Sequence, residues 1–158
     1  MDSEQDEQAN VQHEAWKVKR ILAPVDFSEA SLAGLDYAAA IGEHFDAELV
    51  VLFVVEPVRF PGDRDALAEH EQRVGRRELS RLEQRFRDRP LRYRALLQTG
   101  APPQVIVEQA ERLGADLIVM ATHGRTGLSH LLLGSVAEKV VRSARCPVLT
   151  VHPVSPTT

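Results

Sequence analysis

Short runs of β-branched and other apolar residues alternate with longer stretches of helical spacing from Lys19 onwards. Such runs are typical of strands, and apolar residues at intervals of three and four are typical of helices. Because strands joined through helices lie parallel, the alternation predicts an α/β fold with an open five-stranded parallel sheet and helices on both faces. The expected strands cover residues 21–25, 48–55, 91–97, 116–121 and 147–152, and the expected helices start near Ser28, Asp65, Pro102 and Ser135.

The length of 158 residues favours a single domain, since a typical domain has about 150 residues. We expect this domain to span residues 17–153. Residues 1–16 carry five acidic side chains and almost no apolar ones, so we expect a disordered leader there. Residues 154–158 are expected to form a flexible tail.

Composition argues against several classes of function. The 19 basic and 23 acidic residues give a net charge of -4, which provides no overall attraction to nucleic acid or to an anionic membrane. The longest apolar run, residues 49–55, is much shorter than the about 20 residues of a membrane span, and the acidic N-terminus does not resemble a signal peptide. The single cysteine, Cys146, cannot form an internal disulfide. We therefore expect a cytoplasmic protein that binds neither nucleic acid nor membranes.

Side-chain polarity places two of the expected strands within the sheet. Residues 49–55 are continuously apolar, as in a strand covered on both faces, so this strand belongs inside the sheet. Arg92 and Arg94 suit a strand at or near an exposed edge. The helix that starts near Asp65 mixes arginine with glutamate, which favours an exposed face with ion pairs over a nucleic-acid patch.

Polar residues and glycines gather where two expected strands end. In an open parallel sheet, ligands bind beyond the carboxyl ends of the strands. One strand ends in Asp26, and another ends in the glycine-containing segment 122–127. The last helix begins at Gly134 and Ser135, which brings bare N–H groups, a hydroxyl and a helix N-terminus together. The sequence therefore predicts an anion site at this edge of the sheet.

Other motifs that bind phosphate or carry catalysis are missing from the sequence. A Walker A loop needs a lysine after its glycine, and no lysine stands between Lys19 and Lys139. No Rossmann Gly-x-Gly-x-x-Gly segment follows the first strand, and no recognisable set of nucleophile and base or of metal ligands is present. Mg²⁺ could still be held through bound phosphates by Asp26, Ser135 and Thr122.

Several of these residues also have ordinary structural interpretations. Asp26 could cap the helix that follows it, and spacing alone favours this as much as a ligand contact. Gly124 and Gly127 alone are more typical of turns, although their register with Gly134 favours a phosphate site. The three leucines at 131–133 fit packing or an oligomer contact. Cys146 is expected to be a packed, unreactive thiol.

Two segments of the chain resemble the signatures of a known family. KRILAPVDFSEAS and ATHGRTGLSHLLLGSVAEKVVRSARCPVLTV are similar to the N-terminal and C-terminal signatures of the universal stress protein (UspA-like) family. The resemblance runs from about Lys17 to His152. It implies a sheet of order 3-2-1-4-5, as in the adenine nucleotide alpha-hydrolase-like fold, together with homodimers and, in one subgroup, ATP binding.

The glycine motif of the ATP-binding subgroup is matched at three of its positions. Gly124 and Gly134 correspond to its second and third glycines, Ser135 to its hydroxyl, and Ala121 replaces its first glycine. The resemblance implies that Asp26 would lie at the ribose or adenine, with Val54 and Met120 flanking the base. The full set of expected nucleotide-binding residues is Pro24, Val25, Asp26, Val54, Met120, Ala121, His123, Gly124, Gly134, Ser135 and Val136.

The expected function is that of a regulatory protein in the stress response. ATP or another adenine nucleotide, accompanied by Mg²⁺, would occupy the site and modulate binding of an unknown regulatory protein partner. One alternative is a slow ATPase or phosphotransferase that uses the same pocket, and another is an interaction module that binds no nucleotide.

The resemblance also bears on assembly, because a sheet of order 3-2-1-4-5 has its last strand at an edge. This strand contains no lysine, glycine or internal proline that would block pairing with a second chain. We therefore expect a homodimer through Val148, Leu149, Thr150 and Val151.

Overall fold

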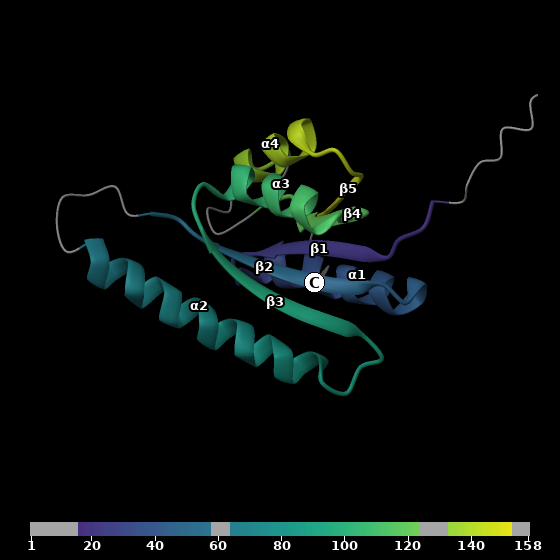
Figure 1. Ribbon diagram of the computed structural model, residues 1–158, viewed down its shortest axis with the longest axis horizontal. Coiled ribbons are helices and arrows are strands. Elements are labelled where there is room, and N and C mark those ends of the chain that lie inside the picture. The colour runs from purple at the N-terminus through teal and green to yellow at the C-terminus, as the bar shows by residue number, and fades with distance from the viewer. Residues whose placement is uncertain (1–15, 58–63, 124–132, 153–158) are drawn as a thin grey trace, which may run out of the picture.

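The computed structural model describes residues 16–57, 64–123 and 133–152, and these form an α/β sheet with helices on both faces (Figure 1). The expected leader at 1–16, apart from Trp16, and the expected tail at 154–158 lie outside the described residues. All five expected strands and all four expected helices are present, with ends that differ by at most two or three residues. The elements are β1 (Arg20–Val25), α1 (Glu29–Phe45), β2 (Glu48–Val55), α2 (Arg64–Phe86), β3 (Arg92–Thr99), α3 (Pro102–Leu113), β4 (Leu117–Ala121), α4 (Ser135–Ser143) and β5 (Val148–Val151).

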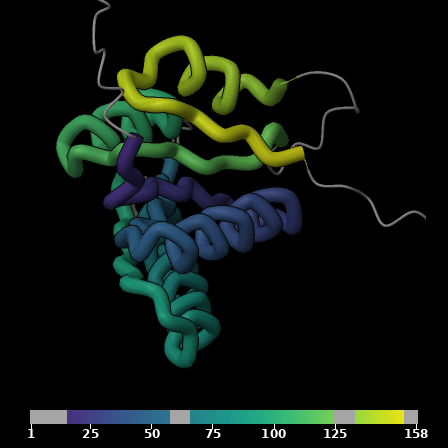
Figure 2. Tube along the Cα trace, turned by 90° about the vertical axis from the view of Figure 1, so that its right-hand side faces the viewer, coloured from purple at the N-terminus to yellow at the C-terminus, as the bar shows by residue number. Residues whose placement is uncertain are grey.

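The five strands are parallel and follow the order β3-β2-β1-β4-β5, as the resemblance implied. Helices α1 and α2 cover one face of the sheet, and α3 and α4 cover the other; Figure 2 shows the two layers on either side of the strands. Strands β2 and β3 extend the sheet on one side of β1, whereas β4 and β5 extend it on the other side. The direction in which strands are added therefore reverses between β1 and β4. That position is the topological switch point of the sheet.

Two buried clusters hold the helices to the sheet, one on each face. Along β2, Leu49, Val51 and Phe53 pack toward α1 and α2, whereas Val50 and Leu52 pack toward α3 and α4. This alternation explains why the expected central strand is apolar at every position after its first. The buried apolar side chains of α2, Leu79, Leu82 and Phe86, recur at helical spacing and so share one face of the helix.

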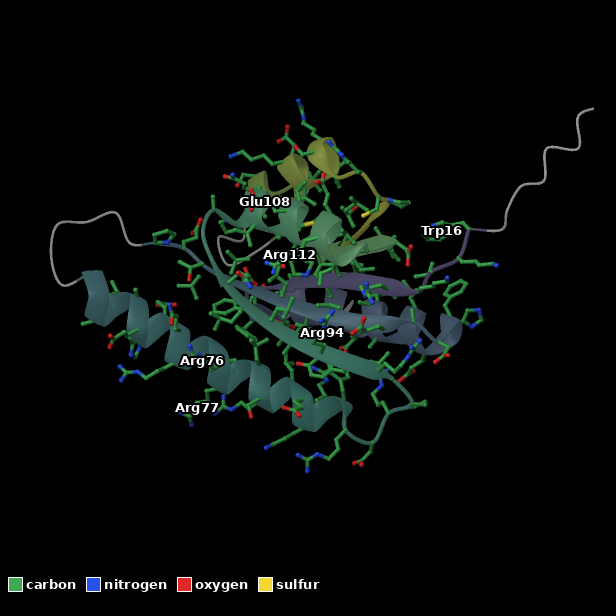
Figure 3. All side chains as sticks on the ribbon, viewed as in Figure 1. Trp16, Arg76, Arg77, Arg94, Glu108 and Arg112 are labelled. Carbon is green, nitrogen blue, oxygen red and sulfur yellow. The ribbon has the colours of Figure 1, made fainter. Side chains whose placement is uncertain are left out.

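Charged residues of α2 and β3 lie on the outside, as expected. Arg81 of α2 pairs with Glu78 one turn earlier, and Arg85 pairs with Asp36 of α1. Arg76 and Arg77 are exposed on α2, and Arg94 is exposed on the edge strand β3 (Figure 3). No helix within the described residues is long and apolar enough to cross a membrane.

The amino-terminal edge of the sheet is tied together by ion pairs and charge-assisted hydrogen bonds. Glu48 at the start of β2 accepts from Arg20 of β1 at 2.6 Å and lies 3.3 Å from Nε of Arg94 on β3. Asp116, just before β4, accepts from the backbone amides of Lys19 and Arg20 at 2.8 and 2.9 Å. Four strands are therefore connected through side chains at the edge opposite to the expected ligand site.

Candidate functional site

A cavity of about 520 Å³ opens at the carboxyl edge of the sheet, beside the switch point. Its floor is made by the ends of β1, β2 and β4, and its walls by residues near the N-termini of α2, α3 and α4. In a parallel sheet every helix begins near the carboxyl end of the strand before it, so these N-termini converge on one edge.

Ten of the eleven expected site residues line this one cavity, although they come from four separate parts of the chain. The remaining one, Gly124, lies outside the described residues, as do Gly127 and Leu131–Leu132. The ten are Pro24, Val25, Asp26, Val54, Met120, Ala121, His123, Gly134, Ser135 and Val136. Their convergence makes the cavity a candidate binding site.

Helices α2 and α3 contribute wall residues that the sequence interpretation missed. Leu67 and Glu71 come from α2, Pro102 and Ile106 from α3, and Glu56 follows β2. The signal that could have found them is topological. Helix α2 follows β2, which neighbours β1, and helix α3 follows β3, the next strand outward. Both helices therefore begin at the same edge of the sheet as the site.

The N-terminus of α4 is open toward the cavity. The N-cap position, Gly134, has no side chain to accept from the helix, and its carbonyl receives the first intrahelical bond from Glu138 at 2.9 Å. The amides of the first turn, Ser135, Val136 and Ala137, therefore have no carbonyl partner within the helix. All three residues line the cavity, so they present N–H groups and the positive end of the helix dipole to a ligand.

The N-terminus of α1 is already occupied by a carboxylate of the chain. Asp26 Oδ1 accepts from the amide of Ser28 at 3.0 Å and from its hydroxyl at 2.5 Å, and Ser28 Oγ in turn accepts from the amide of Ser31 at 3.2 Å. Ser28 is the N-cap of α1, as expected, and Asp26 supports that cap. Asp26 therefore orients the capping residue and is not itself the N-cap, and it also lines the cavity.

A sharp turn of the backbone directs Asp26 to this place. Phe27 adopts a left-handed conformation with φ of 62°, which is unusual for an aromatic residue. Its ring packs against Phe53 of β2 at a centroid distance of 4.8 Å. Partial burial of the ring against the core contributes to offsetting the cost of the strained backbone, which is of order 1–3 kcal/mol for such a residue.

The N-terminus of α3 offers an apolar surface to the cavity instead of hydrogen-bond donors. Pro102 and Pro103 begin the helix and have no N–H groups, and Ala101 at the N-cap makes no side-chain hydrogen bond. Pro102 and Ile106 line the cavity beside Met120. Of the helix N-termini α1, α3 and α4, that of α4 places three residues with first-turn amides at the cavity wall and has no side-chain cap.

Carboxylates are the charged side chains of the described cavity wall. Asp26, Glu56 and Glu71 line it, and no lysine or arginine does so within residues 16–57, 64–123 and 133–152. Among the described residues, the groups that could hold an anionic ligand are the backbone amides and the helix dipole of α4. The described residues contain no cluster of three or more His, Cys, Asp or Glu side chains suited to a resident metal.

His123 is the imidazole at the cavity wall. Its Nδ1 lies 2.9 Å from Thr122 Oγ1, and its Nε2 is buried with no hydrogen-bond partner among the described residues. A buried polar atom left unpaired costs about 1–3 kcal/mol, so this nitrogen favours a partner supplied from elsewhere.

Close packing surrounds the position at which Ala121 replaces the glycine of the motif. A Cβ added to Gly34 of α1 would lie 3.2 Å from the backbone nitrogen of Ala121, so α1 approaches β4 closely here. Strand alternation puts the Ala121 methyl on the same face as Val119, which packs toward α1. The apolar wall of the cavity, with Met120 and Ile106, belongs to the opposite face.

Cys146 lies outside the cavity wall and packs against the cluster under α3 and α4. Partial burial raises the pKa of its thiol, which lowers the fraction of reactive thiolate at neutral pH. This agrees with the expected packed, unreactive thiol.

The parallel sheet, its switch point and the convergent helix N-termini define an α/β protein of the doubly wound, Rossmann-like class. Residues 17–152 match the Universal stress protein family, and the chain belongs to this family. Universal stress protein MJ0531 of Methanocaldococcus jannaschii is 38% identical over 138 residues, which cover 84% of this chain and 81% of that protein.

Two solved structures extend the comparison. Protein MJ0577, also from Methanocaldococcus jannaschii, is 28% identical with a TM-score of 0.77 and coverage of 87% of this chain and 98% of that one. A universal stress protein solved in complex with cAMP is 25% identical, with a TM-score of 0.62 and coverage of 86% and 98%.

Proposed function

We propose that this protein binds an adenine nucleotide, such as ATP, in the cavity at the carboxyl edge of the sheet. The observation that carries the proposal is the open N-terminus of α4, where Ser135, Val136 and Ala137 offer unpartnered helix amides. The phosphates lie there, because the N-terminus of α1 already holds Asp26 and that of α3 begins with two prolines. The cAMP complex of a related protein supports a ligand made of adenine, ribose and phosphate.

The base lies against the apolar part of the wall. Val54 and Met120 come from strands on either side of β1, and Ile106 of α3 closes the cavity above them. Burial of a purine against such side chains supplies affinity at about 25 cal/mol per Å² of apolar area. Asp26 and the hydroxyl of Ser31, which also line the cavity, are suited to the ribose.

Mg²⁺ accompanies the nucleotide in this proposal and arrives with its phosphates. Asp26 and the hydroxyls of Ser135 and Thr122 stand at the cavity wall and could contact the hydrated ion. Nucleotide occupancy then alters the surface that a regulatory protein partner recognises in the cytoplasm. Slow hydrolysis in the same pocket and a role without nucleotide remain the outcomes that the experiment below separates.

The proposal includes a homodimer formed through β5. This strand is at the edge of the sheet, and Leu149 on it is 39% exposed. A second copy related by a twofold axis would continue the sheet antiparallel and satisfy its outward N–H and C=O groups. The exposed Val141 of α4 would add apolar area beside it.

Extraction of the purified protein, followed by chromatography, tests whether it carries an adenine nucleotide. Calorimetry with ATP and Mg²⁺ should give a dissociation constant of about nanomolar to tens of micromolar. No heat and no thermal shift at millimolar ATP would overturn the proposal. Sustained phosphate release that is lost in a cavity variant would instead identify a slow ATPase.

A matched pair of substitutions at Val136 tests the position of the phosphates. Val136→Glu places a negative charge in the first turn of α4, where it suits the helix dipole but repels an anionic ligand. Val136→Gln has nearly the same shape without the charge. ATP binding should be much weaker in the Glu variant than in the Gln variant, whereas the uncharged ligand adenosine should bind both alike. Equal binding of ATP to both variants would place the phosphates elsewhere.

A further inference from the structure

Two histidines that follow different strands both contact one threonine hydroxyl at the edge of the cavity. Thr122 Oγ1 lies 2.9 Å from Nδ1 of His123 and 3.1 Å from Nδ1 of His152, the residue that follows β5. The centroids of the two imidazole rings are 5.5 Å apart, and the angle between the ring planes is 66°. Thr122 and His123 line the cavity, whereas His152 is exposed outside it.

The hydroxyl has a single hydrogen, which constrains how the two rings can be protonated. Thr122 Oγ1 can donate to only one Nδ1, although its two lone pairs can accept from both. If both hydrogen bonds are made, at least one ring therefore carries a hydrogen on Nδ1. A His123 ring with a bare Nδ1 that accepts from the hydroxyl thus requires His152 to carry its hydrogen on Nδ1 and donate it to Thr122.

The two rings differ in burial, and this difference decides which tautomer of His123 suits a ligand. Nε2 of His123 is buried and has no partner in the described part of the chain, so its state depends on what enters the cavity. His152 is exposed, and water can hydrogen-bond its Nε2 with or without a hydrogen. The exposed ring can therefore adapt to the buried one.

We propose that Thr122 and His152 are positioning residues, which hold His123 with its hydrogen on Nε2 so that it donates to an anionic oxygen of the ligand. His152 Nδ1–H donates to Thr122 Oγ1, and the hydroxyl donates to the bare Nδ1 of His123. An anionic oxygen can only accept, so it selects this arrangement. The identity of the oxygen as a nucleotide phosphate rests on the proposed function.

Nuclear magnetic resonance of the ligand-free protein tests the coupling directly. Long-range ¹⁵N–¹H spectra distinguish the Nδ1–H and Nε2–H tautomers and show when both rings are neutral. In the wild type, neutral His123 should carry its hydrogen on Nε2 and neutral His152 on Nδ1, and Thr122→Val should remove this joint preference. Identical tautomers in the wild type would overturn the proposal, whatever the protein binds.

Binding measurements test the consequence for the ligand. Thr122→Val and His152→Phe keep the approximate shape of each side chain but remove one member of the relay. Each should weaken AMP binding by about two- to tenfold, the range expected for loss of one hydrogen bond, and leave adenosine binding unchanged. Thr122→Ser and His152→Asn keep a hydroxyl and a donor near Nδ1, so they should restore the affinity for AMP.

Thr99→Val is the matched control, because Thr99 also ends a strand but lies outside the cavity wall. It should bind AMP like the wild type. Unchanged AMP affinity in Thr122→Val, or an Nδ1–H tautomer of His123 in the AMP complex, would overturn the proposal. If the wild type binds neither AMP nor adenosine, the proposed function fails, and the ligand-free spectra still decide the coupling.

Discussion

The amide of Gly134 donates a hydrogen bond of 2.7 Å to the carbonyl of Thr122, and a Cβ added to Gly134 would lie 2.8 Å from that same oxygen. This contact joins the first residue before α4 to the residue after β4. The protein itself therefore requires a glycine at position 134, independently of any phosphate. The sequence interpretation considered this glycine only as part of an anion site, and the structure adds a packing reason for it.

Gly134→Ala should consequently lower stability as well as affinity. The methyl group must displace the Thr122 carbonyl, and overpacking of this kind costs about 1–3 kcal/mol. Thermal unfolding should show a lower Tm without ligand, and calorimetry should show weaker ATP binding. An unchanged Tm would mean that the junction can relax at no cost.

Ser135→Ala should affect binding without affecting the fold. The substitution removes one hydroxyl from the cavity wall and leaves the amides of α4 in place, so the loss is about 1.5–3 kcal/mol if the hydroxyl contacts a charged oxygen. Isothermal calorimetry measures this change. Ser143→Ala, at the exposed opposite end of the same helix, is the control and should bind ATP normally.

Ala121→Gly restores the glycine of the motif and tests whether the methyl group obstructs a nucleotide. Because the methyl faces α1 and not the apolar cavity wall, we expect unchanged ATP affinity. Glycine in the strand should lower the free energy of unfolding by about 0.5–1 kcal/mol. Tighter binding by this variant would show that the methyl crowds the nucleoside.

Tyr93 should make stability fall at alkaline pH. Burial, with a smaller effect from Glu83, raises the pKa of its phenol to about 12. The folded protein therefore holds this proton more tightly than the unfolded chain, whose phenol titrates near about 10. The contribution is fully present below pH 10 and is lost as pH rises toward 12.

Tyr93→Phe should remove this pH dependence. In urea unfolding, the stability difference between wild type and variant should shift in favour of the variant between pH 10 and pH 12. Tyr37→Phe is the control, because Tyr37 is 56% exposed. Parallel stability curves for wild type and Tyr93→Phe would contradict the prediction.

Proline substitutions in β5 distinguish loss of the proposed dimer from damage to the sheet. The carbonyls of Pro147 and Val151 accept from β4 at 3.0 Å, so odd-numbered residues of β5 direct their backbone groups inward and even-numbered residues direct them outward. Thr150→Pro should therefore give a folded monomer, whereas Leu149→Pro should damage the sheet. Light scattering and circular dichroism measure the two effects. A monomeric wild type at about tens of micromolar would exclude the dimer.

Much of the fold could be predicted from the chain because local patterns and tertiary packing agree. β2 begins and ends at the residues expected from its apolar run, and Ser28 caps α1 as its position suggested. The strand order came from the resemblance, since periodicity alone does not distinguish one arrangement of parallel strands from another. The structure then places ten expected site residues at one cavity.

The rest of the site depends on contacts between residues far apart in the sequence. Glu71 and Ile106 have no local feature that marks them as wall residues, because helix packing alone brings them to the cavity. No local pattern marks His152, because its contact with Thr122 spans 30 positions. The close approach of Gly134 to Thr122 is likewise invisible before the chain folds.

The ion pairs of Glu48 and the hydrogen bonds of Asp116 hold the strands at one edge of the sheet, and the cavity lies at the other. The side-chain contacts that hold the strands together and the candidate binding cavity thus lie at opposite ends of the strands. Substitutions after the strands can change what the protein recognises while the edge that keeps the strands in register stays intact. This separation makes the chain a scaffold on which the proposed ligand preference can diverge, in nature or by design, provided that positions which also pack tightly, such as Gly134, are kept.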